Sequence, residues 1–195
     1  LPNFARMLRV KDLTCFRIDR ALFKPVSFSL NEGEILQVCG PNGSGKTTLM
    51  RTLVGLYKNY TGCFSWDASV PPLYLGHKPA INANLTPREN IKWGFEVIRQ
   101  SIEDADIDKV IYEIGLADSA NTRCSDLSLG QKKRVALAPF CRGQNPLWIM
   151  DEPFSSLDGI GINLLYELFQ KRSASGGLII FSSHQEIPAG LEVKK

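Results

Sequence analysis

Apolar residues occur in short runs separated by polar turns along this chain of 195 residues. Runs of strand length, several of them bounded by Gly, Pro or Asn, lie at 7–10, 26–30, 35–39, 73–75, 147–150 and 178–181. Apolar positions at helical spacing predict helices at 46–56, near 107–114 and at 160–171. Because strands alternate with helices, we expect an α/β fold with a mostly parallel sheet.

From Thr86 to about Ala117 the pattern changes to that of helices. Thr86-Pro87-Arg88-Glu89 places a capping residue, a proline at the first helical position and a glutamate at the third. We expect one domain over 1–195, with an inserted helical subdomain at approximately 86–128 plus the helix that follows it.

A phosphate-binding loop follows the apolar run 35–39. Gly40 to Thr48 fit the pattern G-x-x-x-x-G-K-[ST], between a strand and a helix as that motif requires. Glycines let backbone N–H groups surround phosphate oxygens, and the helix dipole adds positive charge. The predicted binding residues are Gly40, Pro41, Asn42, Gly43, Ser44, Gly45, Lys46, Thr47 and Thr48. Lys46 is placed to reach the β- and γ-phosphates, and the Thr47 hydroxyl to bind Mg²⁺.

Two carboxylates end the apolar strand 147–150. At the rim of the sheet, Asp151 can hold Mg²⁺ through water, and Glu152 can orient or deprotonate an attacking water molecule. A plain strand followed by a charged turn is the alternative, but the preceding phosphate loop favours the catalytic interpretation.

Composition narrows the possible partners. The chain is 44% hydrophobic and 22% charged, as expected for one globular domain, and a net charge of +3 gives no reason to expect nucleic acid. Five cysteines without a C-x-x-C pair argue against a disulfide framework or a zinc site. Since no apolar stretch approaches about 18–20 residues, we expect no membrane span.

The segment Leu127-Ser128-Leu129-Gly130-Gln131 resembles the signature of ATP-binding cassette (ABC) ATPases, usually Leu-Ser-Gly-Gly-Gln. In that family the signature faces the γ-phosphate held by a second chain. The resemblance therefore implies ATP-contacting roles for Ser128, Gly130 and Gln131, and an ATP-dependent homodimer. Ser128 as an ordinary helix N-cap is the alternative.

Three more positions match the same family. Asp158 falls in the segment that resembles the D-loop, and His184 stands where a switch histidine contacts the γ-phosphate. Phe16 lies where the family stacks an aromatic ring on adenine, although it could instead belong to the core. The implied fold is a P-loop NTPase core with N-terminal antiparallel strands.

His77 distinguishes this chain from most cassette ATPases. It stands eight residues before Leu85, where a glutamine is usual. Through this histidine and the segment Pro146-Leu147-Trp148-Ile149, the chain resembles the haem-exporter ATPase subunit of the cytochrome c maturation system. That resemblance implies a Mg²⁺-dependent ATPase with Glu152, His77 and His184 in catalytic roles. A solvated loop position is the alternative for His77.

The same resemblance implies polytopic membrane subunits as partners. The chain would then lie peripherally on the cytoplasmic face of the bacterial inner membrane, or on the matrix face of the mitochondrial inner membrane. The competing hypothesis is a soluble ABC-type ATPase that regulates assembly or acts on nucleic acid or ribosomes.

The sequence departs from the family pattern at three positions. Leu129 replaces a small signature residue, and a leucine does not readily take a positive φ. Pro139 falls where the signature helix usually carries an arginine, and a proline there can end or kink the helix. Lys78 replaces the glutamine that usually follows a histidine at position 77. These departures bear on the rate of hydrolysis rather than on nucleotide binding.

Overall fold

The computed structural model describes residues 7–66, 70–183 and 191–195. The chain divides into two compact units, which we describe separately. The first unit comprises Leu1–His77, Asn145–Pro153 and Lys171–Lys195, and the second comprises Lys78–Gln144 and Phe154–Gln170.

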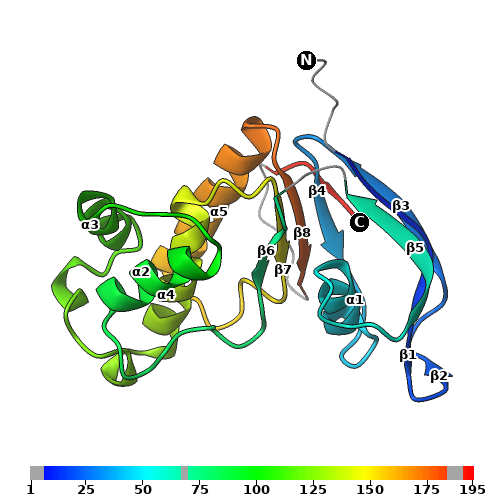
Figure 1. The fold of residues 1–195 in the computed structure, drawn as a ribbon, viewed down its shortest axis with the longest axis horizontal. Helices are drawn as coiled ribbons and strands as arrows, with labels where there is room; N and C mark the ends of the chain where they lie inside the picture. Colours follow the sequence, from blue (N-terminus) through cyan, green and yellow to red (C-terminus); the bar gives the residue numbers. More distant parts are fainter. Residues whose placement is uncertain (1–6, 67–69, 184–190) are drawn as a thin grey trace. The chain divides into compact units, whose positions relative to one another are not determined.

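A parallel sheet of five strands forms one layer of the first unit, in the order β6-β7-β8-β4-β9 (Figure 1). Its strands are β4 (Ile35–Val38), β6 (Leu73–Leu75), β7 (Leu147–Met150), β8 (Leu178–Ser182) and β9 (Val193–Lys194). Every residue of β7 and β8 is buried. Continuous apolar runs are expected where both faces of a parallel strand are covered. The predicted mostly parallel sheet is therefore confirmed.

An antiparallel sheet forms the other layer of this unit. It contains β1 (Met7–Arg17), β2 (Arg20–Ala21), β3 (Val26–Asn31) and β5 (Tyr60–Trp66), and β1 pairs with the other three strands. The register shifts between Val10 and Leu13, and Asp12 there has a φ of 48°. This bulge lets β1 continue well beyond the predicted strand at 7–10.

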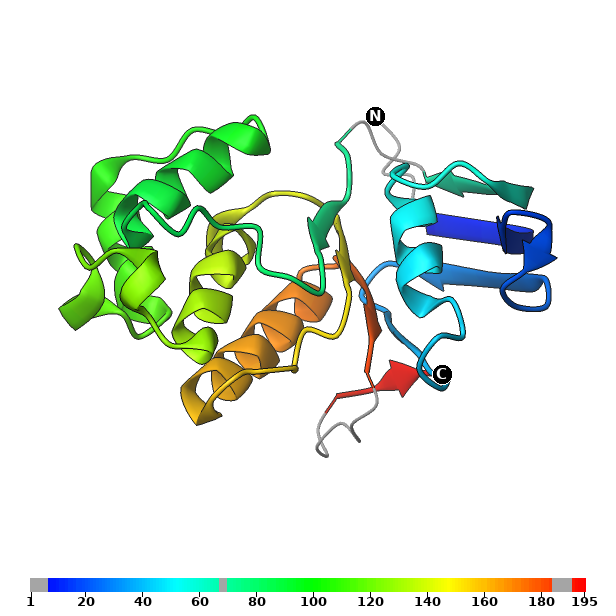
Figure 2. The same ribbon diagram turned by 90° about the horizontal axis from the view of Figure 1, so that it is seen from below.

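Helix α1 (Lys46–Leu53) joins the two sheets in one core. Its buried Leu49, Met50 and Leu53 belong to the same cluster as residues of β1, β7 and β8, and Figure 2 shows α1 (cyan) against the blue strands. The helix ends earlier than the predicted 56, because Gly55 turns the chain with a φ of 78°. The Leu56 N–H donates to the Arg51 carbonyl and Gly55 N–H to Thr52, which completes a Schellman motif.

The second unit is helical, as the sequence predicted for its first part. Its elements are α2 (Pro87–Val97), α3 (Asp104–Glu113), the short 3₁₀ turns η1 (Ala117–Ser119) and η2 (Cys124–Asp126), α4 (Leu129–Arg142), and most of α5 (Gly159–Ala174). Thr86 caps α2 through a full capping box with Glu89, as expected. Among the described residues, no helix is long and apolar enough to cross a membrane.

Candidate functional site

The phosphate loop connects β4 to the first residue of α1, Lys46. Gly45 caps the helix in the left-handed conformation, with a φ of 95°. A side chain there would also meet a neighbour, since an added Cβ would lie 2.7 Å from the Phe23 ring. Only glycine therefore fits this turn. The first N–H groups of α1 have no partner within the helix, as at any helix start, and are available to an anion.

Lys46 reaches back over the loop that precedes it. Its Nζ donates to the carbonyl oxygens of Gly40 at 2.7 Å and Pro41 at 3.1 Å, and the side chain is buried. These contacts hold a positive charge at the loop, where the negative charge of a triphosphate would be placed.

Asp151 is the polar centre at the ends of the parallel strands. It follows β7 directly and is 1% exposed. One carboxylate oxygen accepts from the Thr47 hydroxyl at 2.7 Å, and the other accepts from the Ser182 hydroxyl at 2.8 Å. The two predicted Mg²⁺ ligands, Thr47 and Asp151, therefore lie side by side, although they are 104 positions apart in the sequence.

This pair fits Mg²⁺. Hydroxyl and carboxylate oxygens are the donors that this ion prefers, and it commonly binds through one or two carboxylates together with substrate phosphates and water. Among the described residues there is no cluster of three or more His, Cys, Asp or Glu side chains suited to a metal. Thr47 and Asp151 would thus supply only part of the coordination, leaving positions for phosphate oxygens.

Glu152 has an unusual backbone conformation, with a φ of 49°. Left-handed geometry is costly for a residue with a side chain, so other contacts must maintain it. One of them is a hydrogen bond of 2.8 Å from the Glu152 N–H to the Ser182 hydroxyl oxygen. Ser182 thereby positions both carboxylate residues, since it also donates to Asp151.

A cavity of about 330 Å³ brings these groups together. Its lining includes the carboxylates Asp151 and Glu152, His77 two positions after β6, and most of the loop, namely Asn42, Gly43 and Gly45 to Thr48. Of the predicted loop residues, Gly40, Pro41 and Ser44 line a neighbouring, mostly apolar cavity of about 280 Å³.

The cavity also includes two residues that the sequence analysis missed, Arg17 and Leu22. Phe16 is half-buried near the end of β1 and is not among the described lining residues. His184, the predicted switch histidine, lies outside the residues that the structure describes.

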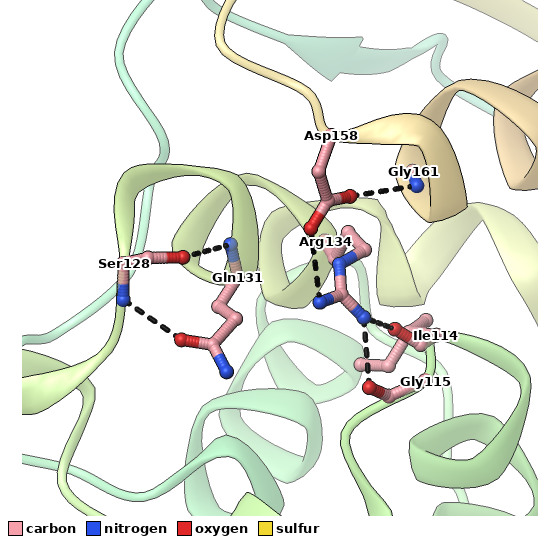
Figure 3. Close-up of polar contacts among 7 residues, drawn as sticks. All are labelled: Ile114, Gly115, Ser128, Gln131, Arg134, Asp158 and Gly161. Atoms are coloured by element: carbon pink, nitrogen blue, oxygen red, sulfur yellow. Dashed lines mark hydrogen bonds and ion pairs between the residues drawn. The ribbon is translucent and has the colours of Figure 1, made fainter.

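Ser128 begins the signature helix in the second unit. Its hydroxyl oxygen accepts from the Gln131 N–H at 3.2 Å, and the Gln131 side chain accepts from the Ser128 N–H at 2.8 Å (Figure 3). This is a capping box, so the N-cap alternative for Ser128 describes its contacts within the chain. Ser128 is also exposed, as a residue that contacts a ligand from outside must be.

Asp158 is linked to the signature helix by Arg134. The guanidinium donates to the Asp158 carboxylate at 3.2 Å and to the Gly115 carbonyl at 2.8 Å, and it also donates to the Ile114 carbonyl (Figure 3). The other carboxylate oxygen of Asp158 accepts from the Gly161 N–H at 2.9 Å, at the start of α5. Arg134 is 4% exposed. One buried cation therefore connects α3, α4 and the segment before α5.

The two departures in the signature helix are accommodated. Leu129 is the first residue of α4, is 72% exposed, and is not among the residues with a positive φ, so it avoids the conformation that a leucine does not readily take. Pro139 lies inside α4, which continues to Arg142, so the proline does not end the helix.

The site residues thus form two groups. Lys46, Thr47, Asp151, Glu152 and His77 gather in the first unit. Ser128, Gly130, Gln131 and Asp158 belong to the second unit, where an added Cβ on Gly130 would lie 3.4 Å from Asp158.

Comparisons with known proteins identify the family of this chain. Residues 23–155 match the family described as ABC transporter. The cytochrome c biogenesis ATP-binding export protein CcmA of Yersinia pestis is 39% identical over 193 residues, which cover 94% of this chain and 88% of that protein. The protein of the same name from Vibrio cholerae is 37% identical, with 93% of this chain and 92% of the relative covered.

Solved structures show the same fold. A putative ABC transporter ATP-binding protein from Pyrococcus furiosus has a TM-score of 0.83 at 20% identity, over 97% of this chain and 96% of that one. At this level of identity the likeness concerns the fold alone. The family match and the curated relatives carry the assignment further, and the chain belongs to the ABC transporter family.

Proposed function

We propose that this chain is the ATP-hydrolysing subunit of a membrane ABC transporter that exports haem for cytochrome c biogenesis. ATP binding and hydrolysis follow from the family to which the chain belongs. The more specific role is supported by the CcmA relatives, whose names include cytochrome c biogenesis and export and which match nearly the whole chain. One observation carries the enzymatic part, the gathering of Lys46, Thr47, Asp151, Glu152 and His77 around one cavity.

The phosphate loop binds the triphosphate in this proposal. The N–H groups at the start of α1 donate hydrogen bonds to phosphate oxygens, and Lys46 exchanges its contacts with Gly40 and Pro41 for the β- and γ-phosphates. Thr47 and Asp151 hold Mg²⁺, which supplies neutralising charge to the phosphates when it is bound.

Glu152 is the general base or water-orienting group. Its backbone N–H is held by Ser182, and its side chain lines the cavity that contains Lys46 and Thr47. In that position the carboxylate can accept a proton from the water that attacks the γ-phosphate. His77 lines the same cavity and can donate a hydrogen bond to the reacting phosphate or to that water.

A second copy of the chain completes each site in this proposal. Ser128, Gly130, Gln131 and the start of α4 would face the γ-phosphate bound by the partner's loop. Two-fold symmetry then gives two equivalent sites. ATP that binds the closed pair better than the open pair would drive closure, and hydrolysis would release it.

Polytopic membrane subunits would receive this movement, with the chain peripheral on the cytoplasmic face of the bacterial inner membrane or the matrix face of the mitochondrial one. The test is affinity purification of the tagged chain from detergent-solubilised membranes, followed by identification of the bound proteins and an ATPase assay. Co-purification of polytopic proteins with ATPase activity is expected. Recovery only from the soluble fraction, bound to ribosomes or nucleic acid, would instead favour the soluble-ATPase alternative.

A further inference from the structure

Two residues that line the phosphate-loop cavity have no role in phosphate or Mg²⁺ binding in the function proposed above. Arg17 is the last residue of β1, and Leu22 follows β2 directly. Leu22 is held near the loop, since its N–H donates to the Cys15 carbonyl at 2.8 Å and an added Cβ on Gly45 would lie 3.2 Å from the Leu22 Cβ.

The rest of the cavity accounts for the triphosphate end of a nucleotide. Lys46 and Thr47 come from the loop and α1, and Asp151 and Glu152 follow β7. The part of the ligand still without a partner is the nucleoside, whose base presents a flat aromatic face. A planar guanidinium and an aliphatic side chain are well suited to such a face.

Strand geometry favours Arg17 over Phe16 for this contact. Successive side chains of a strand point to opposite faces, so Phe16 and Arg17 point away from each other. The backbone of Phe16 is held by Asn59, through an N–H···O bond of 2.9 Å and a side-chain bond of 3.2 Å to the Phe16 carbonyl. Arg17 is exposed and lines the cavity, whereas Phe16 is half-buried and does not.

The positive charge of the neighbouring Arg20 also favours Arg17 for this contact. Arg17 pairs with Arg20 across the β1–β2 hairpin, and both are exposed. Like charges directly opposite each other on a sheet are unfavourable. Among the described residues we find no hydrogen bond or ion pair of the Arg17 side chain, so its guanidinium is available to an electron-rich partner.

We propose that Arg17 is the nucleobase platform of this site, with its guanidinium stacked on the base and Leu22 packed beside it. This proposal rests on the nucleotide-binding function proposed above. It assigns to a cation the contact for which the family resemblance suggested the aromatic ring of Phe16.

The test compares two probes by calorimetry on the full chain, ATP and inorganic tripolyphosphate, which lacks a base. Arg17→Ala should weaken ATP binding about three- to tenfold, the loss expected for one stacking or cation–π contact. Tripolyphosphate affinity should stay within about twofold of the wild type, because the base is the only group that Arg17 contacts in the proposal. Arg17→Trp restores a flat surface and should recover ATP affinity.

Arg20→Ala is the matched control, since it removes the neighbouring cation outside the described cavity lining and should leave ATP affinity unchanged. Equal affinity of Arg17→Ala and wild type for ATP would overturn the proposal, as would an equal loss for both probes, which would indicate a phosphate contact. A loss in Phe16→Leu but not in Arg17→Ala would return the platform to Phe16. Lys46→Ala tests the underlying function separately, because it should weaken both probes.

Discussion

Glu152 combines a strained backbone with a position beside the phosphate loop. Its positive φ is maintained in part by one hydrogen bond to Ser182, whose hydroxyl also donates to Asp151. Strain that the surroundings maintain in this way is common where a side chain must be aimed. The Asp-Glu pair is thus built as a unit around a single serine.

We expect Glu152→Gln to retain binding of Mg²⁺-ATP and to hydrolyse it about 10²–10⁴-fold more slowly, because the amide has a similar shape but cannot accept the proton. A radioactive-phosphate release assay measures the rate, and gel filtration should show dimers trapped by ATP. Glu167→Gln, on the exposed side of α5, is the control. Undiminished turnover in Glu152→Gln would remove this residue from the proposed mechanism.

Lys46→Ala should lower ATP affinity by about one to two decades, since a charge-assisted contact of about 1.5–3 kcal/mol is lost. Turnover should also be abolished. Calorimetry with ATP gives the affinity, and Lys58→Ala, an exposed lysine after α1, serves as the control. An affinity equal to that of the wild type would contradict the phosphate-binding role.

At the level of single residues, the sequence predicted those that belong to short contiguous motifs. The gathering of Lys46, Thr47, Asp151 and Glu152 followed from a loop and a strand end whose geometries are well known. Arg17 had no such signal, because it lies at the end of an unpredicted strand extension and enters the cavity only through the fold.

Two helices begin with the same kind of cap. Thr86 and Ser128 each form a capping box, with Glu89 and Gln131 respectively. The pKa of the Glu89 carboxyl lies below its ordinary value, chiefly because the Thr86 backbone N–H donates to it. The ionised Glu89 carboxylate therefore stabilises the folded state fully above the ordinary carboxyl pKa. This stabilisation is lost as the pH falls through the lowered pKa.

Replacing each cap by alanine separates structure from function. Thr86→Ala and Ser128→Ala should each lower the free energy of unfolding by about 1 kcal/mol, measured in urea. Only Ser128→Ala should also reduce ATPase activity, by about ten- to a hundredfold, if its hydroxyl bonds a charged phosphate. Similar ATPase rates in the two variants would mean that Ser128 is a helix cap and nothing more.

Elements with a clear local signal were predicted best. The cap at Thr86 and the strands at 73–75 and 147–150 agree with the structure. Strand β5 was missed because its residues are mostly exposed or half-buried, which leaves no clear alternation of apolar positions. The extension of β1 was missed because the bulge at Asp12 interrupts its pattern.

At the scale of the whole molecule, the site residues belong to two compact units of one chain. The sequence predicted both groups, but only a resemblance suggested how they would meet, since a dimer interface leaves little local pattern. The proposed sharing between two copies can be tested by complementation.

Lys46→Ala and Ser128→Arg should each be inactive alone. A mixed dimer would contain one site with an intact Lys46 and an intact Ser128, so some ATPase activity should return when the two variants are combined. Differently tagged variants, purified as the mixed pair, provide the measurement. Inactive mixed dimers that also fail to occlude ATP would contradict the shared site, whereas occlusion without turnover would mean that the two sites cannot fire independently.

The contacts of Arg134 have a mechanical consequence. Since one buried guanidinium joins the end of α3, the signature helix and Asp158, these three segments cannot be displaced separately without breaking hydrogen bonds to a buried charge. A displacement of the end of α3 would therefore move α4 and Asp158 with it. Any force that a partner exerted there would reach the signature and the D-loop together, so the two would respond to the same load.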